Sequence, residues 1–598
     1  MKHSPFIDGL RAIAVLPVIF FHFNLPYFTG GYIGVDVFFV ISGFLIAGII
    51  HEQMQQKKFS IVRFYERRAR RILPALFVTC FLSTIVALVL FLPNDFIFFA
   101  KSLKGVALFG SNFVFARYVG YFADALSVKP LLHTWSLAVE EQFYVFFPLI
   151  LYFFNRLFKN RNRALYVALC ILFVLSFGLN ASLVTSDPER TFYLLHTRAW
   201  ELLAGAILVL SLKKITLSQF AREMLSFAGM GILLACFVLY SRDTIFPGVA
   251  AVWPVLATLF LIAANRDSGT VVGRVLTTAP FVKVGLISYG LYLYHWPVLV
   301  FARYYLDRDL TAADTLLAIP FIVVLSLLSY ILVEHPIRSG ALLVKRKGLF
   351  LFSAGGLMIL CAIALLIMRS HGLPSRFNGA ALQYAAGQQD TNWRHLECSE
   401  NSVHTLDEKN VCRLGTDSRR PLDFLLWGDS HAGSLSPVAD LLAQQQGLAG
   451  GITIFSGCPS LLGIERADQH ITFSCQEAND RIFNLIRKGK IKNVLLVNRW
   501  DMYALGWEKG GMETTRTPVI SFRRSDGTLL TGKDAFAASF KETVRRLRTL
   551  GVTVWILKQV PPQLVHIPTA LAKAVYLGHD PDKLKRSYQD VLNRRRFL

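Results

Sequence analysis

Charged residues are scarce in this sequence of 598 residues. Asp, Glu, Lys and Arg make up 17% of it, whereas 53% of the residues are hydrophobic and the mean hydropathy is +0.44. This composition excludes a single ordinary soluble domain and indicates a protein with several membrane spans. Acidic residues are scarcer than basic ones, which leaves a net charge of +23. Lys and Arg retained on the cytoplasmic side of a membrane account for that excess, so the expected partner is the lipid bilayer and not nucleic acid.

No cleavable signal peptide is expected, because the first apolar run has no A-x-A-like site and continues into further apolar runs. Such runs fill residues 1–369, a polar linker or extension follows at 370–395, and residues 396–598 have a soluble composition. We therefore predict a polytopic all-α membrane domain followed by a globular domain. About 11 transmembrane helices are expected, at 10–27, 32–52, 73–92, 137–155, 164–184, 197–212, 223–240, 247–264, 281–303, 314–334 and 348–368. The stretch 96–115 carries two Lys and an Asn, so it is left outside this count as an interfacial helix.

Loop charges give the expected orientation of these spans. With the N-terminus inside, the inner loops hold 20 Lys and Arg and the outer connections hold 7. This bias agrees with the positive-inside rule. An odd number of spans then places the C-terminal domain outside.

The cysteines point to the same side. No CxxC or His-x-His pair is present, so no metal site is expected. The four cysteines of the predicted spans are most simply buried small hydrophobes. The other four lie in the soluble part at separations of 14 and 17, which predicts the local disulfides Cys398–Cys412 and Cys458–Cys475, although four cysteines allow three connectivities. Disulfides indicate an oxidising compartment.

Two ionisable residues, Arg11 and His22, lie within the first apolar run. They are about three helical turns apart, so they face the same way with roughly 16 Å between them along the axis, about half of a bilayer core. Ionisable residues inside membrane helices usually face a functional interior. The alternative is an Arg that reaches the cytoplasmic surface and a His bonded to a neighbouring helix. These two residues alone leave both interpretations open.

The first inner loop, RFYERRARRILP, holds four arginines between positions 67 and 71. Such a cluster can serve membrane topology alone. It would also suit the phosphates of a nucleotide-like donor on the cytoplasmic side, because guanidinium groups bind phosphate with two parallel hydrogen bonds.

Further polar residues lie at the outer ends of the predicted spans. In LLHTWSLAVEEQFY, Glu140 lies within about a turn of Ser136; surface carboxylates at the headgroup level are the alternative interpretation. The other candidates for the membrane site are Asp36, Ser136, Arg198, Glu201 and His295. Together with the inner arginines they suggest a path through the bilayer, with a phosphate-rich donor inside and acid–base chemistry nearer the outside.

Several stretches between residues 5 and about 340 resemble the membrane acyltransferase-3 family: FIDGLRAIAVL, GYIGVDVFFVISGFLI, RFYERRARRILPAL, HTWSLAVEEQFY and SYGLYLYHWP. The Arg-x10-His spacing of Arg11 and His22 belongs to this resemblance, as does the R-x-x-R pattern, best aligned on Arg68 and Arg71. It implies transfer of an acyl group, commonly acetyl from acetyl-CoA, to a carbohydrate of the cell envelope. Arg11, Arg68 and Arg71 would hold this donor substrate, and no bound cofactor is expected. His22 and Glu140 would be catalytic, with His22 as base, relay or temporary acyl carrier, oriented by a carboxylate such as Glu140.

The soluble part is predicted to be an α/β domain. In PLDFLLWGDSHAG an apolar strand runs into Ser430 and then a helix, and the strands in GITIFS, NVLLVNRW and VTVWILKQV alternate with helical stretches, which indicates a layered parallel sheet. LLWGDSHA, SGCPS and VLLVNRW resemble the SGNH hydrolase/transferase superfamily. Fusion of such a three-layer domain to an acyltransferase-3 domain is an architecture of O-antigen acetyltransferases. This resemblance makes Ser430 the nucleophile and Gly457 and Asn498 the oxyanion donors.

The sequence departs from the superfamily pattern in the residues that would activate the serine. The superfamily supplies its base and orienting acid from a late Asp-x-x-His motif, and no such motif follows Ser430. His431 adjoins the serine, and His566 and His579 have no Asp three residues before them. We therefore expect either a C-terminally incomplete domain or a serine without an activating partner.

The leading hypothesis is an O-acyltransferase of the bacterial inner membrane, with a cytoplasmic N-terminus and a periplasmic C-terminal domain. It would move acetyl from cytoplasmic acetyl-CoA to a sugar hydroxyl of a lipid-linked polysaccharide such as lipopolysaccharide O-antigen. The alternative is a transporter of an acyl donor or lipid-linked glycan with an outer glycan-binding domain. An esterase on an inert anchor ranks lower, because an anchor needs one span and no buried Arg–His pair.

Overall fold

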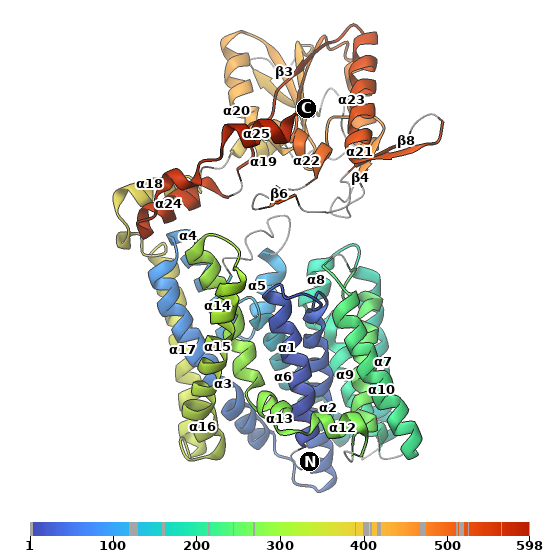
Figure 1. Ribbon diagram of the computed structural model, residues 1–598, viewed down its shortest axis with the longest axis vertical. Helices are drawn as coiled ribbons and strands as arrows, with labels where there is room; N and C mark the ends of the chain where they lie inside the picture. The colour runs from blue at the N-terminus through green and yellow to red at the C-terminus, as the bar shows by residue number, and fades with distance from the viewer. Residues whose placement is uncertain are drawn as a thin grey trace. The chain divides into compact units, whose positions relative to one another are not determined.

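The computed structural model describes residues 4–118, 129–157, 162–212, 216–242, 244–266, 269–388, 390, 392–398, 406, 410–415, 420–466, 474–506, 508–509, 512–513, 520–523, 526–563 and 565–596. The chain divides into two compact units, residues 1–374 and 375–598. Each unit is described by itself. The first is built of helices, whereas the second combines helices with strands (Figure 1).

The helices of the first unit run mostly along one common direction (Figure 1). They are α1 (Pro5–His22), η1 (Gly31–Ile33), α2 (Gly34–Gln55), α3 (Ile61–Leu90), α4 (Pro93–Ala107), α5 (Ser111–Tyr118), α6 (Thr134–Leu157), α7 (Asn162–Leu183), α8 (Pro188–Tyr193), α9 (Leu195–Ser211), α10 (Gln219–Leu239), η4 (Gly248–Ala251), α11 (Val252–Ala264), α12 (Val271–Leu276), α13 (Ala279–Leu286), α14 (Ser288–Leu306), α15 (Ala312–Ser329), η5 (Tyr330–Glu334), α16 (His335–Ser339) and α17 (Arg346–Arg369).

Eight of these helical segments are long and apolar enough to cross a membrane, and the bent pair α13 and α14 would make a ninth. The first unit is therefore a membrane unit, as predicted. Two further expected spans, 137–155 and 247–264, coincide with α6 and with η4–α11, which are not among those eight. The total of eleven thus stays a prediction.

The stretch 96–115, expected to be an interfacial helix, folds as α4 and α5. Helix α4 packs against α17 and α5, and α5 packs against α6. The apolar face of α4 is buried through Phe96, Phe99 and Leu103. These two helices therefore contribute to the core of the unit.

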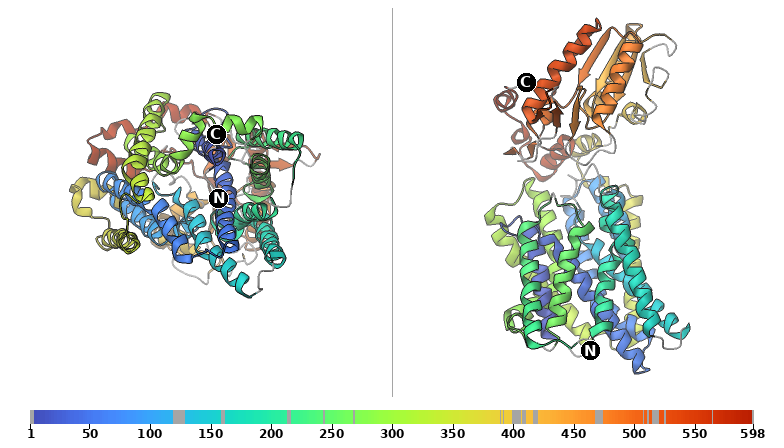
Figure 2. Two further views of the ribbon diagram at one scale, coloured as in Figure 1. Left: turned by 90° about the horizontal axis from the view of Figure 1, so that it is seen from below. Right: turned by 90° about the vertical axis from the view of Figure 1, so that its right-hand side faces the viewer.

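Helix α1, the element with Arg11 and His22, lies inside the bundle against α2, α13 and α14 (Figure 2). Glycine permits such close packing of helices in this unit. A Cβ placed on Gly285 would lie 1.9 Å from the carbonyl oxygen of Asp8, and one placed on Gly43 would lie 1.8 Å from that of Leu202. Small residues let membrane helices approach to backbone contact, which here brings α13 against α1 and α2 against α9.

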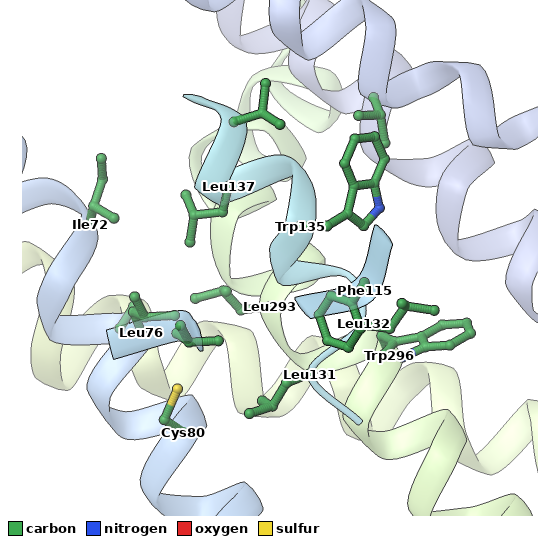
Figure 3. Close-up of a cluster of buried hydrophobic side chains, with 14 of the residues drawn as sticks. Ile72, Leu76, Cys80, Phe115, Leu131, Leu132, Trp135, Leu137, Leu293 and Trp296 are labelled. Carbon is green, nitrogen blue, oxygen red and sulfur yellow. The ribbon is translucent and has the colours of Figure 1, made fainter. Parts of the chain in front are cut away.

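The core around the site is formed by large apolar side chains from α3, α6 and α14. Figure 3 shows Leu76, Trp135, Leu137 and Leu293 among the members of this cluster. Trp296 extends it toward the end of α1 and is 7% exposed. Van der Waals packing among these side chains keeps the polar groups between the helices in fixed positions.

The second unit is organised on a five-stranded sheet in the order β1-β3-β2-β5-β10. Its strands are β1 (Cys412–Gly415), β2 (Phe424–Gly428), β3 (Ala449–Ile454), β5 (Asn493–Val497) and β10 (Thr553–Ile556). The four strands predicted from the sequence pair in parallel, and β1 adds an antiparallel edge. Smaller sheets are formed by β4 (Ile464–Arg466), β8 (Ile520–Arg523) and β9 (Leu529–Thr531), and by β6 (Glu508–Lys509) and β7 (Met512–Glu513).

Helices cover both faces of the five-stranded sheet. Leu426 packs with residues of α20 (Ser430–Gln445) on one face. Leu425 and Trp427 pack with α21 (Cys475–Lys488) and α23 (Gly532–Thr549) on the other. The remaining helices are η6 (Pro374–Arg376), which straddles the boundary between the units, α18 (Gly379–Ala386), α19 (Trp393–Cys398), α22 (Trp500–Leu505), α24 (Ile567–Leu577), η8 (Pro581–Leu584) and α25 (Tyr588–Arg595). This arrangement is the predicted three-layer α/β fold.

Both predicted disulfides, Cys398–Cys412 and Cys458–Cys475, are present in the second unit. The first joins α19 to β1, and the second joins the loop after β3 to α21. The stretch expected as a linker or extension, 370–395, includes α18, which packs against α24. It therefore serves as an extension of the second unit.

Candidate functional site

A pocket in the first unit collects three of the predicted arginines. The pocket has a volume of about 100 Å³ and lies between α1, α2, α3, α6 and α14. Its polar lining residues are Arg11, Ser42, Arg68, Arg71, Ser136, Glu140, Tyr144, Ser288, Tyr289 and Tyr292. Arg11 and the R-x-x-R pair thus line one cavity together with Glu140, although they come from three different helices.

Arg68 and Arg71 differ from Arg11 in their partners. Arg11 pairs with Asp8 at 3.1 Å. Neither Arg68 nor Arg71 forms an ion pair within the part of the chain that the structure describes, and Nε of Arg68 is buried without a hydrogen-bond partner. The Arg68 guanidinium instead lies over the rings of Phe64 and Tyr144, at 5.9 and 6.0 Å from their centroids. A buried cationic group of this kind favours an anionic ligand in the pocket.

A smaller cavity of about 30 Å³ adjoins the first, because Arg11, Arg71 and Tyr289 line both. Its other charged residues are Asp8, Glu334 and Arg338. The charged lining therefore continues from the pocket to Asp8 in the first turn of α1, with carboxylates as well as arginines.

Glu140 makes different contacts from those expected. The sequence suggested that this carboxylate orients His22. In the structure Glu140 accepts hydrogen bonds from the Ser42 hydroxyl at 2.7 Å and the Tyr144 hydroxyl at 3.1 Å. The expectation was wrong because Glu140 faces the arginine pocket, whereas His22 ends α1 and bonds another imidazole.

That imidazole belongs to His295. Nδ1 of His22 lies 3.1 Å from Nε2 of His295, and Nδ1 of His295 lies 2.7 Å from the carbonyl oxygen of Tyr292. The ring of His133 is 5.8 Å from that of His295. The Tyr292 hydroxyl bonds Ser136 at 2.6 Å and lines the pocket, so one tyrosine borders both the arginine pocket and the histidine cluster.

Tyr292, Ser42 and Tyr144 were not among the predicted site residues. Tyr292 precedes His295 by three positions and Tyr144 follows Glu140 by four, and side chains at these spacings share one face of a helix. That spacing could have identified both tyrosines. Ser42 contacts Glu140 from another helix, and no local pattern signals it.

Asp36, Arg198 and Glu201 form a separate buried group. Arg198 lies 3.0 Å from Asp36 and 2.9 Å from Glu201, and the exposure of all three side chains is at most 1%. Four aromatic rings surround its guanidinium at 5.5 to 5.7 Å, those of Phe39, Trp135, Phe192 and Phe246. None of the three charged residues lines either cavity described above. They tie α2 to α9 as an ionic crosslink.

In the second unit Ser430 begins α20, directly after β2. The connection through α20 leads to β3 on one side of β2, whereas β5 pairs with its other side. Ser430 therefore lies at the carboxyl end of the strand where the chain order reverses, the usual place for ligands in open α/β sheets.

Asp429 fixes the backbone around this serine. Its carboxylate accepts hydrogen bonds from the backbone N–H groups of His431 and Arg499 and from the Tyr503 hydroxyl, at 2.8 to 2.9 Å. Burial raises the pKa of Asp429 above its usual range, and these donors oppose the rise. The carboxylate thereby joins the turn at Ser430 to the loop after β5 and to α22.

The two predicted oxyanion residues are placed differently. Gly457, with φ of 82°, lies in the loop after β3, and its carbonyl accepts from the Arg466 guanidinium. The side chain of Asn498 is 1% exposed and bonds both the backbone N–H and the hydroxyl of Ser460, at 3.0 and 2.5 Å. Asn498 thus orders the loop through Ser460 with its oxygen and one of the two N–H donors of its amide, and its role as an oxyanion donor stays a prediction.

No imidazole is hydrogen-bonded to the Ser430 hydroxyl among the residues that the structure describes. Burial lowers the pKa of His431 below its ordinary value, and the nearby Asp429 carboxylate opposes that shift. His566 bonds Thr569 at 2.8 Å, and both His566 and His579 are exposed at the ends of α24. Serine is a poor nucleophile without an adjacent base.

We therefore expect the full chain in detergent to hydrolyse a chromogenic acetyl ester no faster than its Ser430→Ala variant. Spectrophotometric release of 4-nitrophenol measures this rate. Ser434→Ala, one turn along α20 and exposed, is the matched control. Rapid hydrolysis by the unmodified chain that disappears only in Ser430→Ala would contradict the prediction.

A bundle of apolar helices around an arginine-lined pocket, joined to an α/β unit with a serine at a strand-to-helix turn, defines a two-part membrane protein with a hydrolase-like domain. The family model described as an acyltransferase domain matches residues 4–335. The model described as an SGNH domain fused to AT3 domains matches residues 397–598. The chain therefore belongs to the acyltransferase-3 family with a fused SGNH domain, which confirms the family inferred from the motifs.

Several curated relatives of this chain come from Staphylococcus aureus. The chain is 31% identical over 409 residues to the O-acetyltransferase OatA of strain NCTC 8325 / PS 47, a match that covers 65% of this chain and 66% of the relative. It is 32% identical over 409 residues to OatA of strain MRSA252, with the same coverage. The chain thus spans slightly less than two thirds of the length of these relatives. No solved structure matches it.

Proposed function

We propose that this protein is a membrane O-acyltransferase that moves an acyl group, acetyl being the expected one, from acetyl-CoA to a sugar hydroxyl of an envelope glycan such as lipopolysaccharide O-antigen. The observation that carries this proposal is the pocket that Arg11, Arg68 and Arg71 line together with Glu140. The guanidinium groups of Arg68 and Arg71, which have no carboxylate partner among the described residues, suit the phosphates of coenzyme A. The staphylococcal relatives are O-acetyltransferases by name, which supports the same reaction class.

The proposed orientation is that of a bacterial inner-membrane protein with its N-terminus in the cytoplasm. Arg11, Arg68 and Arg71 lie in the first halves of α1 and α3, next to a loop with Lys57 and Lys58. Basic loops favour the cytoplasmic side, where acetyl-CoA is found. The two disulfides support a periplasmic second unit.

In the proposed reaction the oxygen of the sugar hydroxyl forms a bond to the acetyl carbon, and the thioester C–S bond breaks. The imidazole of His22 accepts the hydroxyl proton and passes it to the coenzyme A sulfur, so the products are an acetyl ester and a free thiol. Glu140 balances the positive charge of the arginine pocket through its fixed carboxylate. Ser430 is not required for this step.

The decisive experiment supplies purified protein in proteoliposomes with acetyl-CoA labelled in the acetyl group as sole donor and a lipid-linked polysaccharide as acceptor. We expect label in the glycan, released as acetate by mild base. Label that crosses the membrane without appearing on the glycan would instead support the transporter hypothesis and overturn the proposed transfer.

Arg68→Ala and Arg71→Ala are expected to raise the KM for acetyl-CoA, because each removes a charge-assisted contact to phosphate. Such a contact contributes roughly 1.5–3 kcal/mol, which corresponds to a rise of about 10- to 150-fold. Arg63→Ala is the matched control, since Arg63 is exposed on the same helix. Initial rates against acetyl-CoA concentration test this. An unchanged KM in both variants would show that these arginines serve topology only.

A further inference from the structure

The contacts of His295 determine which of its nitrogens carries a proton. Nδ1 of His295 lies 2.7 Å from the Tyr292 carbonyl oxygen. A carbonyl oxygen can only accept a hydrogen bond, so Nδ1 of His295 is the donor. In a neutral imidazole the other nitrogen then carries a lone pair and accepts. Nε2 of His295 is therefore an acceptor.

The tautomer of His295 also determines which nitrogen of His22 carries a proton. Nε2 of His295 contacts Nδ1 of His22 at 3.1 Å. Because the His295 nitrogen accepts, the proton in this contact belongs to Nδ1 of His22. The second nitrogen of His22, Nε2, is left with its lone pair in the neutral ring.

We propose that His295, held by the Tyr292 carbonyl, is a positioning residue that selects the Nδ1–H tautomer of His22 and so presents Nε2 of His22 as the proton acceptor in acyl transfer. The inference rests on the proposed function. It extends the logic by which a fixed partner orients a catalytic histidine. Here the partner is a neutral imidazole, which avoids the cost of a buried carboxylate between membrane helices.

Neighbouring rings hold the pair in place. Trp296 contacts the His22 ring edge-on with centroids 4.7 Å apart, and its indole N–H donates to the Lys129 carbonyl at 2.8 Å. The rings of His22 and His295 lie 5.2 Å apart and are tilted by only 24°. His295 itself is 0% exposed. Water is thus excluded as a competing partner for Nε2 of His295, so the carbonyl-directed tautomer persists.

In the proposed step, Nε2 of His22 accepts the proton of the sugar hydroxyl. The hydroxyl oxygen forms a bond to the acetyl carbon, and the thioester C–S bond breaks. The resulting imidazolium, stabilised by donation from Nδ1–H to His295, returns the proton to the coenzyme A sulfur. If His22 held its proton on Nε2, it could not take the hydroxyl proton in this position.

Two substitutions of His295 separate positioning from packing. The amide of Asn reaches the place of Nδ1 and keeps the bond to Tyr292, but it has no atom at the place of Nε2. The amide oxygen of Gln can reach that place and accept from His22. We expect His295→Asn to lower kcat at least about 10- to 100-fold, the loss typical when a residue that orients a metal-bound histidine is replaced, and by up to about 10⁴-fold, the loss when the orienting partner of a catalytic histidine is replaced. His295→Gln should recover most of that loss, and the KM for acetyl-CoA should be unchanged in both.

A second measurement does not depend on the Gln geometry. Nδ1-methylhistidine incorporated in place of His22 has no proton on Nδ1 and therefore always carries its lone pair on Nε2. In the His295→Asn background this replacement should restore transfer, because the tautomer no longer needs a partner. Elution as a monodisperse peak in detergent serves as the folding control.

Full activity of His295→Asn would overturn the inference, as would equal losses in His295→Asn and His295→Gln with no rescue by the methylated residue. Failure of the proposed function gives a different pattern. In that case His22→Ala itself would retain acetyl transfer, or no variant including the unmodified protein would acetylate the glycan.

Discussion

Replacing His22 with alanine is expected to abolish acetyl transfer to the glycan while the protein still inserts and binds acetyl-CoA. General acid–base catalysis contributes typically 10²–10⁴-fold, so the residual rate should be lower by about that factor. The imidazole ends α1, about 16 Å along the axis from Arg11, and the arginine pocket does not include it. The KM for acetyl-CoA should therefore change little. Initial rates with labelled acetyl-CoA in proteoliposomes give both quantities.

His196→Ala provides the matched control, because His196 is an exposed imidazole on α9 of the same unit. It should leave the rate unchanged. Acetylation of the glycan by His22→Ala at the level of the unmodified protein would remove His22 from the mechanism. A fall in donor binding with unchanged turnover would move its role to the donor pocket.

For the membrane site, sequence patterns predicted part of the arrangement of its residues. Loop charge and helix period predicted that Arg11, Arg68 and Arg71 share the cytoplasmic half, and the structure brings them to one pocket. Neither pattern specifies contacts between helices. The bonds from Glu140 to Ser42 and from His22 to His295 depend on how α1, α2, α6 and α14 cross. Local spacing cannot encode that packing.

The second unit was more predictable because its signals are local. Alternating apolar strands and helices predicted the parallel sheet, and separations of 14 and 17 predicted both disulfides. What the sequence of this unit did not predict is, as in the membrane site, a contact between residues far apart in the chain. The side chain of Asn498 follows β5 as expected, yet it bonds Ser460, which lies 38 residues earlier in the chain. A motif match could not reveal that its amide is engaged.

Arg198→Ala is expected to destabilise the membrane unit more than any surface substitution. Removal of this side chain leaves Asp36 and Glu201 buried beside each other without a cation. Breaking a buried ion pair in this way costs about 3–5 kcal/mol. Four aromatic rings would also lose their central contact. Thermal unfolding in detergent, followed by a thiol-reactive dye that labels the buried Cys80 as it becomes exposed, measures the loss.

Arg190→Ala is the control for Arg198→Ala. Arg190 pairs with Asp187 at 3.5 Å in the same i, i+3 geometry as the Arg198–Glu201 pair, but its side chain is 70% exposed. Exposed pairs contribute about 0–1 kcal/mol, so its transition should barely move. Equal transitions for the two variants would contradict the ionic crosslink between α2 and α9. If Arg198→Ala instead lost acetyl transfer at unchanged stability, the Asp36–Arg198–Glu201 group would belong to the catalytic site, because a purely structural crosslink affects activity only through folding.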